Sequence, residues 1–237
     1  MKILGIESSS LVASVAIVTD GLVTAEYTVN YKKTHSQTLL PMLDEIVRMT
    51  EQDLETIDAI AVSGGPGSFT GLRIGAATAK GLGLALNKPL IHVPTVDAMA
   101  YNLFGCSDLI CPVMDAKRGQ VYTGIYAFQP DFQVIKENVA MDLGELLEEL
   151  KQMERPVVFL GDGVPVGQDQ IQETLGNLAR FAPAPCNRQR GASVAALGSE
   201  YFRLGKVQPA EDFAPSYLRV SQAERVRAER EAALRDG

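Results

Sequence analysis

A glycine-rich block that separates an apolar run from a helix-like run constrains the fold of this chain most. Residues 59–63 are apolar, residues 65–75 read GPGSFTGLRIG, and residues 70–86 are rich in small side chains. A strand, a tight turn and a helix leave free backbone N–H groups at the turn, which favours anion or nucleotide binding. The block lacks the Gly-Lys-Ser/Thr ending of a P-loop and the GxGxxG order of a dinucleotide turn. It predicts an α/β fold, and a rigid turn that positions Arg73 remains an equal interpretation.

The helix expected over residues 70–86 has a small residue once per turn, at Gly71, Gly75, Ala79 and Gly83. This spacing places them on one face, where a second helix could approach closely. We interpret the stripe and Arg73 as an intersubunit contact. A neighbouring helix would join it through the apolar positions Leu39, Leu43, Ile46 and Val47. On this interpretation, Gly75→Leu would abolish pairing without unfolding the lobe.

Composition restricts the class of protein further. The 237 residues are 46% hydrophobic and carry a net charge of −7, which does not favour unaided binding of nucleic acid or anionic membranes. Three cysteines without CxxC spacing favour a reducing compartment, and two histidines leave few ligands for zinc. Glu7 and the three serines after it interrupt the apolar N-terminus, so no signal peptide is expected, and no apolar run reaches the ~18 residues of a membrane span. We expect a cytoplasmic protein.

The order of elements repeats along the chain. Strands are predicted at 2–7, 12–18 and 22–29, followed by the helix around 39–47, a strand at 58–63, the small-residue helix and a strand at 90–93. A second series has strands at 109–114, 120–128 and 132–139, a helix at 142–153 capped by Asp142, and a strand at 156–160. This duplication predicts one lobe over 1–104 and a second over 105–220. The first carries the small-residue stripe, so we expect it to be the partner-binding lobe. The second lobe would contain a helix at 191–205 and an extended arm at 209–219, and a charge-balanced, frayed or disordered tail would follow at 221–237.

Two polar turns occupy equivalent places in the two series. The first contains Glu7, Ser8 and Ser9, and the second contains Asp115, Lys117 and Arg118. An acid followed by hydroxyls or cations is compatible with phosphate or a water-bridged magnesium ion. Ordinary polar turns, with a local ion pair in the second, explain the same residues. The turns would face one another only if the two lobes pack as a clamshell.

Three further features have a functional and a structural interpretation. Gly161–Gly163 could contact an adenine or ribose, or form a strand-to-helix turn. His35 stands at a helix start, where capping is the usual role, and His92 has no catalytic pattern around it. No GxSxG, HExxH or Cys-His arrangement is present.

The block at 63–75 resembles the TsaB family, the non-catalytic partner subunits of bacterial tRNA threonylcarbamoyladenosine synthesis. Residues 6–9, 35–41, 115–122 and 215–219 support the resemblance, which extends from position 6 to position 219. The resemblance implies the two-lobed, actin-like (ribonuclease H-like) ATPase fold, with duplicated mixed sheets flanked by helices. This agrees with the duplicated order of elements.

The family is similar to its catalytic paralogue, the TsaD transferase, whose HxxxH motif binds a metal. The matching positions here are Thr95 and Met99, which are not transition-metal ligands at this type of site. The resemblance therefore implies a catalytically silent subunit without a metal. It also implies no tightly bound cofactor, with ATP or ADP confined to the complex, because Glu7 replaces the aspartate of many related ATPases.

The partners that the resemblance implies are a TsaD-like transferase and a TsaE-like ATPase, with tRNA reached only through the complex and a homodimer when the chain is alone. An active small-molecule kinase or ATPase of the same fold is the main alternative, with Asp115 as its catalytic acid. A metallopeptidase is a third interpretation, against which the missing histidine pair argues.

Overall fold

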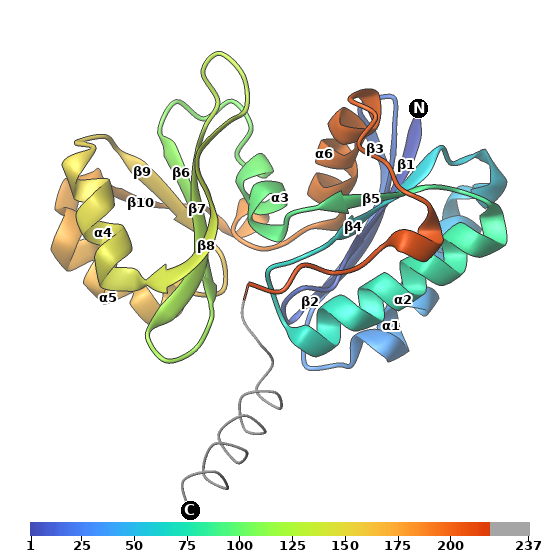
Figure 1. Cartoon of the computed structure of the whole chain (residues 1–237), viewed down its shortest axis with the longest axis horizontal. Helices are drawn as coiled ribbons and strands as arrows, with labels where there is room; N and C mark the ends of the chain where they lie inside the picture. The colour runs from blue at the N-terminus through green and yellow to red at the C-terminus, as the bar shows by residue number, and fades with distance from the viewer. Residues whose placement is uncertain (219–237) are drawn as a thin grey trace, which may run out of the picture.

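The computed structural model describes residues 1–218 and arranges them as two lobes, each built on a five-stranded mixed sheet (Figure 1). The tail expected at 221–237 and the last residue of the expected arm, Arg219, lie outside the described residues. Among residues 1–218, no helix combines the length and the apolar character that a membrane crossing needs.

The sheet of the first lobe has the strand order β3-β2-β1-β4-β5. Its strands are β1 (Lys2–Glu7), β2 (Val12–Thr19), β3 (Leu22–Asn30), β4 (Ala59–Ser63) and β5 (Leu90–Val93). Strands β1, β4 and β5 are parallel, so their carboxyl ends meet at one edge of the sheet. Two helices, α1 (His35–Thr50) and α2 (Phe69–Leu86), pack on one face, and α6 (Gly191–Arg203) packs on the other.

The sheet of the second lobe repeats this plan with the order β10-β9-β6-β7-β8. Its strands are β6 (Leu109–Asp115), β7 (Gln120–Ala127), β8 (Gln133–Asp142), β9 (Val157–Leu160) and β10 (Ala179–Phe181). Helices α4 (Leu143–Gln152) and α5 (Val164–Leu175) cover the outer face, while α3 (Thr95–Tyr101) lies between the lobes and contacts β6, β7 and α6 (Figure 1). The duplicated series read from the sequence is therefore confirmed in both sheets.

Local signals placed several boundaries correctly. Asp142 caps α4, because its carboxylate accepts hydrogen bonds from the backbone N–H groups of Gly144 and Glu145. Pro41 lies inside α1, beyond its first turn. Helix α3 and the short strand β10 were not predicted, because they are too short to show a clear period. Helix α5 was expected only under the strand-to-helix interpretation of Gly161–Gly163.

The lobe boundary expected at residue 220 is wrong. Helix α6 packs on β1, β2 and β4, and its Val194, Ala195 and Leu197 belong to the core of the first lobe. Beyond α6, Gln208 pairs with Leu90 at the edge of β5, and Phe213 is buried beside α2. The second lobe therefore ends before residue 191, and the chain returns to the first lobe.

The small-residue stripe of α2 does not face a second chain. Gly71, Gly75, Ala79 and Gly83 are all buried within the first lobe. A Cβ atom at Gly71 would overlap the carbonyl of Ser8, and one at Gly75 would overlap the Ser8 hydroxyl. The interpretation of this stripe as a direct intersubunit contact is wrong. The β1–β2 turn of the same lobe occupies the space beside Gly71 and Gly75, and Leu90 and Ala210 occupy the space beside Gly83.

The apolar positions assigned to the neighbouring helix are also internal. Leu39, Leu43 and Ile46 are buried in the core that α1 and α2 share with the sheet, and Val47 is half-buried against it. Arg73 is the member of the expected interface that is exposed. Periodicity identified the correct helix face, but that face packs on the chain's own sheet.

Glycine-to-alanine substitution at two positions of α2 separates the buried and exposed faces. Gly75→Ala should destabilise the protein by about 1–3 kcal/mol, because the new methyl group displaces the Ser8 hydroxyl from its bond to the Gly71 carbonyl. Gly81→Ala, on the open side of the same helix, should stabilise it by about 1 kcal/mol through helix propensity. Urea unfolding of both variants checks this, and equal effects would contradict the assigned packing.

Candidate functional site

The two polar turns line one cleft between the lobes, with a volume of about 750 Å³. Ser9 and Ser10 come from the first lobe, and Asp115, Lys117 and Arg118 come from the second. The start of α2 completes the first wall through Ser68 and Phe69. The clamshell arrangement on which the meeting of the turns depended is therefore present. The volume is in the range of small-molecule sites.

Glu7 lies beneath this cleft at the end of β1 and is fully buried. Its Oε1 atom accepts hydrogen bonds from the Ser9 backbone N–H at 2.6 Å and from the Ser9 hydroxyl at 2.5 Å. Its Oε2 atom has no hydrogen-bond partner among residues 1–218. Burial raises the pKa of the Glu7 carboxyl from 4.5 to about 7, although the bonds from Ser9 oppose this shift. The carboxyl is thus partly protonated near neutral pH.

Ser8 and Ser9 are engaged within the lobe. The Ser8 hydroxyl donates to the Gly71 carbonyl at 2.9 Å, and the Ser9 carbonyl accepts from the Ser68 N–H at 2.6 Å. These bonds attach the β1–β2 turn to the first turn of α2. The residues predicted to bind phosphate in this turn therefore hold α2 in place, and only Ser9 among them lines the cleft.

The second turn contains an internal ion pair. Asp115 accepts from the Lys117 backbone N–H at 2.7 Å and pairs with the Lys117 ammonium at 2.5 Å. Partial burial raises the pKa of the Asp115 carboxyl, but the hydrogen bonds and charge of Lys117 bring it below its ordinary value. Lys117, Arg118 and Gly119 all have positive φ, which turns the backbone sharply at the lip of the cleft. The local ion pair expected for this turn is confirmed.

Asp162 is a third acid at the cleft, in the turn between β9 and α5. Burial raises the pKa of its carboxyl, and its Oδ1 atom has no hydrogen-bond partner within residues 1–218. The Gly161–Gly163 segment is the strand-to-helix turn that one of its two interpretations proposed.

The C-terminal arm contributes residues that sequence reasoning did not assign to the cleft. Ser216, Tyr217 and Leu218 line it. The Tyr217 ring lies 4.8 Å from that of Phe69, and the Arg73 guanidinium lies 3.9 Å above Phe69 and donates to the Tyr217 hydroxyl. The signal available in the sequence was the resemblance of residues 215–219 to the family.

The two histidines have structural contacts. His35 begins α1 at the rim of the cleft, where its Nε2 atom lies 3.0 Å from the Val12 carbonyl oxygen. His92 is 3.2 Å from the Ser216 hydroxyl, and burial lowers the pKa of its imidazole. Both contacts join segments of the first lobe.

Thr95 and Met99, which the sequence resemblance set against the HxxxH histidines, are on α3. Thr95 and Met99 are both buried there. Within residues 1–218, no group of three or more His, Cys, Asp or Glu side chains is arranged to hold a metal ion. A hydroxyl and a thioether do not fit the ligand chemistry of a histidine-type metal site.

The buried Glu7 carboxyl makes stability depend on pH. Its folded-state pKa lies above the unfolded value, so the folded protein binds more protons between about pH 4.5 and 7, and stability falls as pH rises through this window. Glu7→Gln keeps the shape and removes the charge. The free energy of unfolding of the variant should match that of the parent near pH 5. At pH 8 it should be higher than that of the parent by on the order of 3 kcal/mol.

Thermal unfolding of both proteins from pH 5 to 8.5 measures this difference, with the exposed Glu55→Gln as control. A parallel pH profile for Glu7→Gln and the parent would contradict the assigned protonation.

Comparison with known proteins places these features in a family. Residues 23–226 match the family model described as TsaD, tRNA N6-adenosine threonylcarbamoyltransferase. The chain is 34% identical over 226 residues to the Bacillus subtilis tRNA threonylcarbamoyladenosine biosynthesis protein TsaB, covering 94% of this chain and 96% of that protein.

Solved structures confirm the two-lobed, actin-like α/β fold class. A Pseudomonas aeruginosa protein described as similar to the peptidase YEAZ superposes with a TM-score of 0.79 at 23% identity, covering 92% of this chain and 99% of that one. The ROK hexokinase of Thermus thermophilus superposes with a TM-score of 0.51 at 12% identity, covering 86% and 100%. The sequence relationship, which extends over nearly the whole of both proteins, shows that this chain belongs to the TsaB family of tRNA threonylcarbamoyladenosine biosynthesis proteins.

Proposed function

We propose that this chain is the non-catalytic subunit that pairs with a TsaD-like transferase and supports threonylcarbamoyl transfer to the tRNA adenosine beside the anticodon. The observation that carries the proposal is the solvent face of α2. Ala77, Gly81, Leu84 and Ala85 are exposed along it, and Leu84 keeps 61% of its surface accessible. A helix face of small and apolar residues without cover is typical of a contact with another helix.

The same side of the lobe offers a matching helix. Helix α1 contacts α2, and its Leu40 is 53% exposed. Arg73 is also exposed on α2, where it is held by Phe69 and Tyr217 at the end of the face nearest the cleft. We call the exposed residues Leu40, Arg73, Ala77, Gly81, Leu84 and Ala85 the α1–α2 face. It replaces the buried stripe as the proposed partner surface.

The proposed lack of activity rests on the chemistry of α3 and the two turns. Thr95 and Met99 stand where the paralogue has metal-binding histidines. The Asp115 carboxylate is paired with Lys117, and the Oε1 atom of Glu7 accepts from Ser9. A transferase partner would therefore supply the metal and the reacting groups, while this chain would supply a docking surface.

The α1–α2 face would also form the proposed homodimer. An isologous pairing of this face would close a homodimer when the transferase is absent. The TsaE-like ATPase and tRNA would then be reached through the complex, in keeping with the net charge of −7 on this chain.

Leu84→Asp tests the surface. It should weaken binding to the TsaD-like transferase of the same organism by at least about tenfold, because a charge would be buried at the helix contact, while leaving the melting temperature unchanged. Leu204→Asp is the matched control, since Leu204 is 68% exposed beyond α6 on the opposite face of the sheet.

Size-exclusion chromatography with light scattering, on the chain alone and mixed with the transferase, provides the measurement. A Leu84→Asp protein that co-elutes with the transferase as the parent does would overturn the assignment of this face.

Nucleotide binding is a second candidate function, favoured by the meeting of both polar turns in one cleft. Lys117 and Arg118 would approach the phosphates, and Asp115 would be the acid of an active kinase. Calorimetric titration of ATP into the isolated chain separates the two functions. Micromolar binding with turnover would favour the kinase, and no binding would favour the docking subunit.

A further inference from the structure

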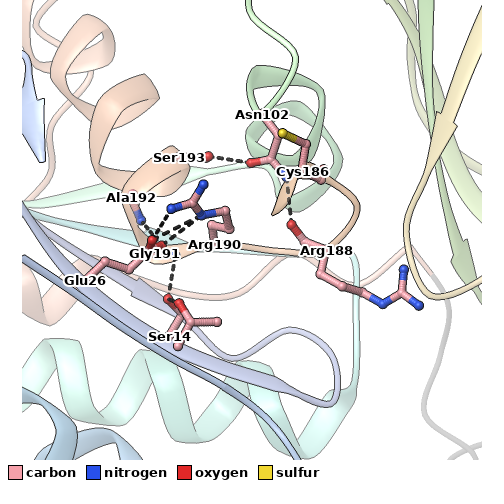
Figure 2. A network of polar contacts seen from close by, with 10 residues as sticks. Ser14, Glu26, Asn102, Cys186, Arg188, Arg190, Gly191, Ala192 and Ser193 are labelled. Atoms are coloured by element: carbon pink, nitrogen blue, oxygen red, sulfur yellow. Dashed lines mark hydrogen bonds and ion pairs between the residues drawn. The ribbon is translucent and has the colours of Figure 1, made fainter. Parts of the chain in front are cut away.

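The two lobes are joined by more than their covalent connections. The chain crosses between them twice, once between α3 and β6 and once between β10 and α6. Asn102, at the end of α3 on the first crossing, donates hydrogen bonds to the carbonyls of Cys186 (3.0 Å) and Arg188 (2.7 Å) on the second. Its own side-chain carbonyl accepts from the Ser193 hydroxyl of α6 (Figure 2). The two crossings are therefore tied to each other beside α3.

The second crossing is also anchored to the first sheet. Glu26 of β3 forms an ion pair with Arg190 and accepts from the Ala192 N–H at 3.1 Å, while Ser14 of β2 accepts from the Gly191 N–H at 2.8 Å (Figure 2). These contacts fix the start of α6 in the first lobe. Helix α3 itself lies between this anchored segment and the second lobe, because it contacts α6 on one side and β6 and β7 on the other.

One buried carboxylate of α3 reaches across to the second lobe. Asp97 of α3 is 4% exposed, and its Oδ1 atom accepts from the Tyr126 hydroxyl of β7 at 2.7 Å. Its Oδ2 atom accepts from the Tyr201 hydroxyl of α6 at 3.3 Å. Burial raises the pKa of this carboxyl, and the hydrogen bonds from both tyrosines oppose the shift. A buried acid is costly unless it is hydrogen-bonded, so the bonds from the two tyrosines offset the cost of burying Asp97.

We propose that α3 is a hinge held by a buried clasp, in which Asp97 joins Tyr126 of the second lobe to Tyr201 of the first and thereby fixes the width of the cleft. Apolar packing also joins α3 to the second lobe, since Val96, Met99 and Ala100 share a core with residues of β6, β7 and β9. The ring centroid of Phe132 lies 5.6 Å from that of Tyr126 and 5.8 Å from that of Tyr101. Such ring contacts tolerate small sliding motions, whereas a short hydrogen bond is directional. Loss of a hydrogen bond to a carboxylate shifts an equilibrium roughly tenfold or more.

The clasp is tested by the distance between two spin labels in the full chain. Labels at the exposed Thr70 of α2 and Asp169 of α5 report the separation of the lobes. Cys106 and Cys186 are replaced by alanine, while Cys111 stays because it is buried and its thiol pKa is raised to about 12. Tyr126→Phe and Asp97→Asn should widen the distance distribution and lengthen its mean.

Tyr122→Phe is the matched control. Tyr122 is on the same strand, and its hydroxyl has no hydrogen-bond partner among the described residues. The proposal is overturned if Tyr126→Phe and Asp97→Asn both keep the parent distribution, or if Tyr122→Phe widens it equally. Should Tyr126→Phe fail to fold, Tyr201→Phe decides, since it breaks the clasp from the first lobe: a widened distribution supports the clasp and an unchanged one removes it.

Discussion

The close approach of the β1–β2 turn to α2 is the constraint on which the rest of the first lobe depends. The Ser8 hydroxyl reaches the Gly71 carbonyl, and the Ser9 carbonyl receives the Ser68 N–H, only because Gly67, Gly71 and Gly75 present no side chain. This contact buries one face of α2 and turns the opposite face to solvent. It also places Glu7 beneath the cleft. The proposed partner surface and the position of Glu7 are therefore two consequences of one packing arrangement.

The cleft combines a shape suited to a ligand with polar groups that are mostly engaged by their own chain. Asp115 is paired with Lys117 and Glu7 Oε1 accepts from Ser9, while Glu7 Oε2 and Asp162 Oδ1 have no hydrogen-bond partner within residues 1–218. The C-terminal arm returns from α6 to place Tyr217 against Phe69 and Arg73, so the far end of the sequence helps to form the cleft mouth. The local pairing of Asp115 and of Glu7 Oε1 is consistent with a subunit whose proposed role is to dock rather than to react.

Much of the fold was readable from local pattern. The alternation and apolar runs of the strands, the cap at Asp142 and the repeated order of elements all reflect short-range physics, in which side-chain period and backbone propensity decide the outcome. The meeting of the two polar turns did not follow from local pattern, because the turns belong to different sheets and meet only through the packing of the two lobes. The pairing of Asp115 with Lys117 was within reach, since the two residues are neighbours in the chain.

The contacts that each helix face makes could not be predicted from local sequence pattern. A stripe of small residues indicates that another part of a protein approaches the helix closely. A turn of the same chain and a helix of another chain fit such a stripe equally well. The sequence by itself determined the elements, their order and the faces that must be buried. Only the tertiary structure decided that the Gly71–Gly83 stripe is internal, that α6 and the arm belong to the first lobe, and that Asp97 meets tyrosines from both lobes. Those contacts join residues far apart in the chain, and no local period carries information about them.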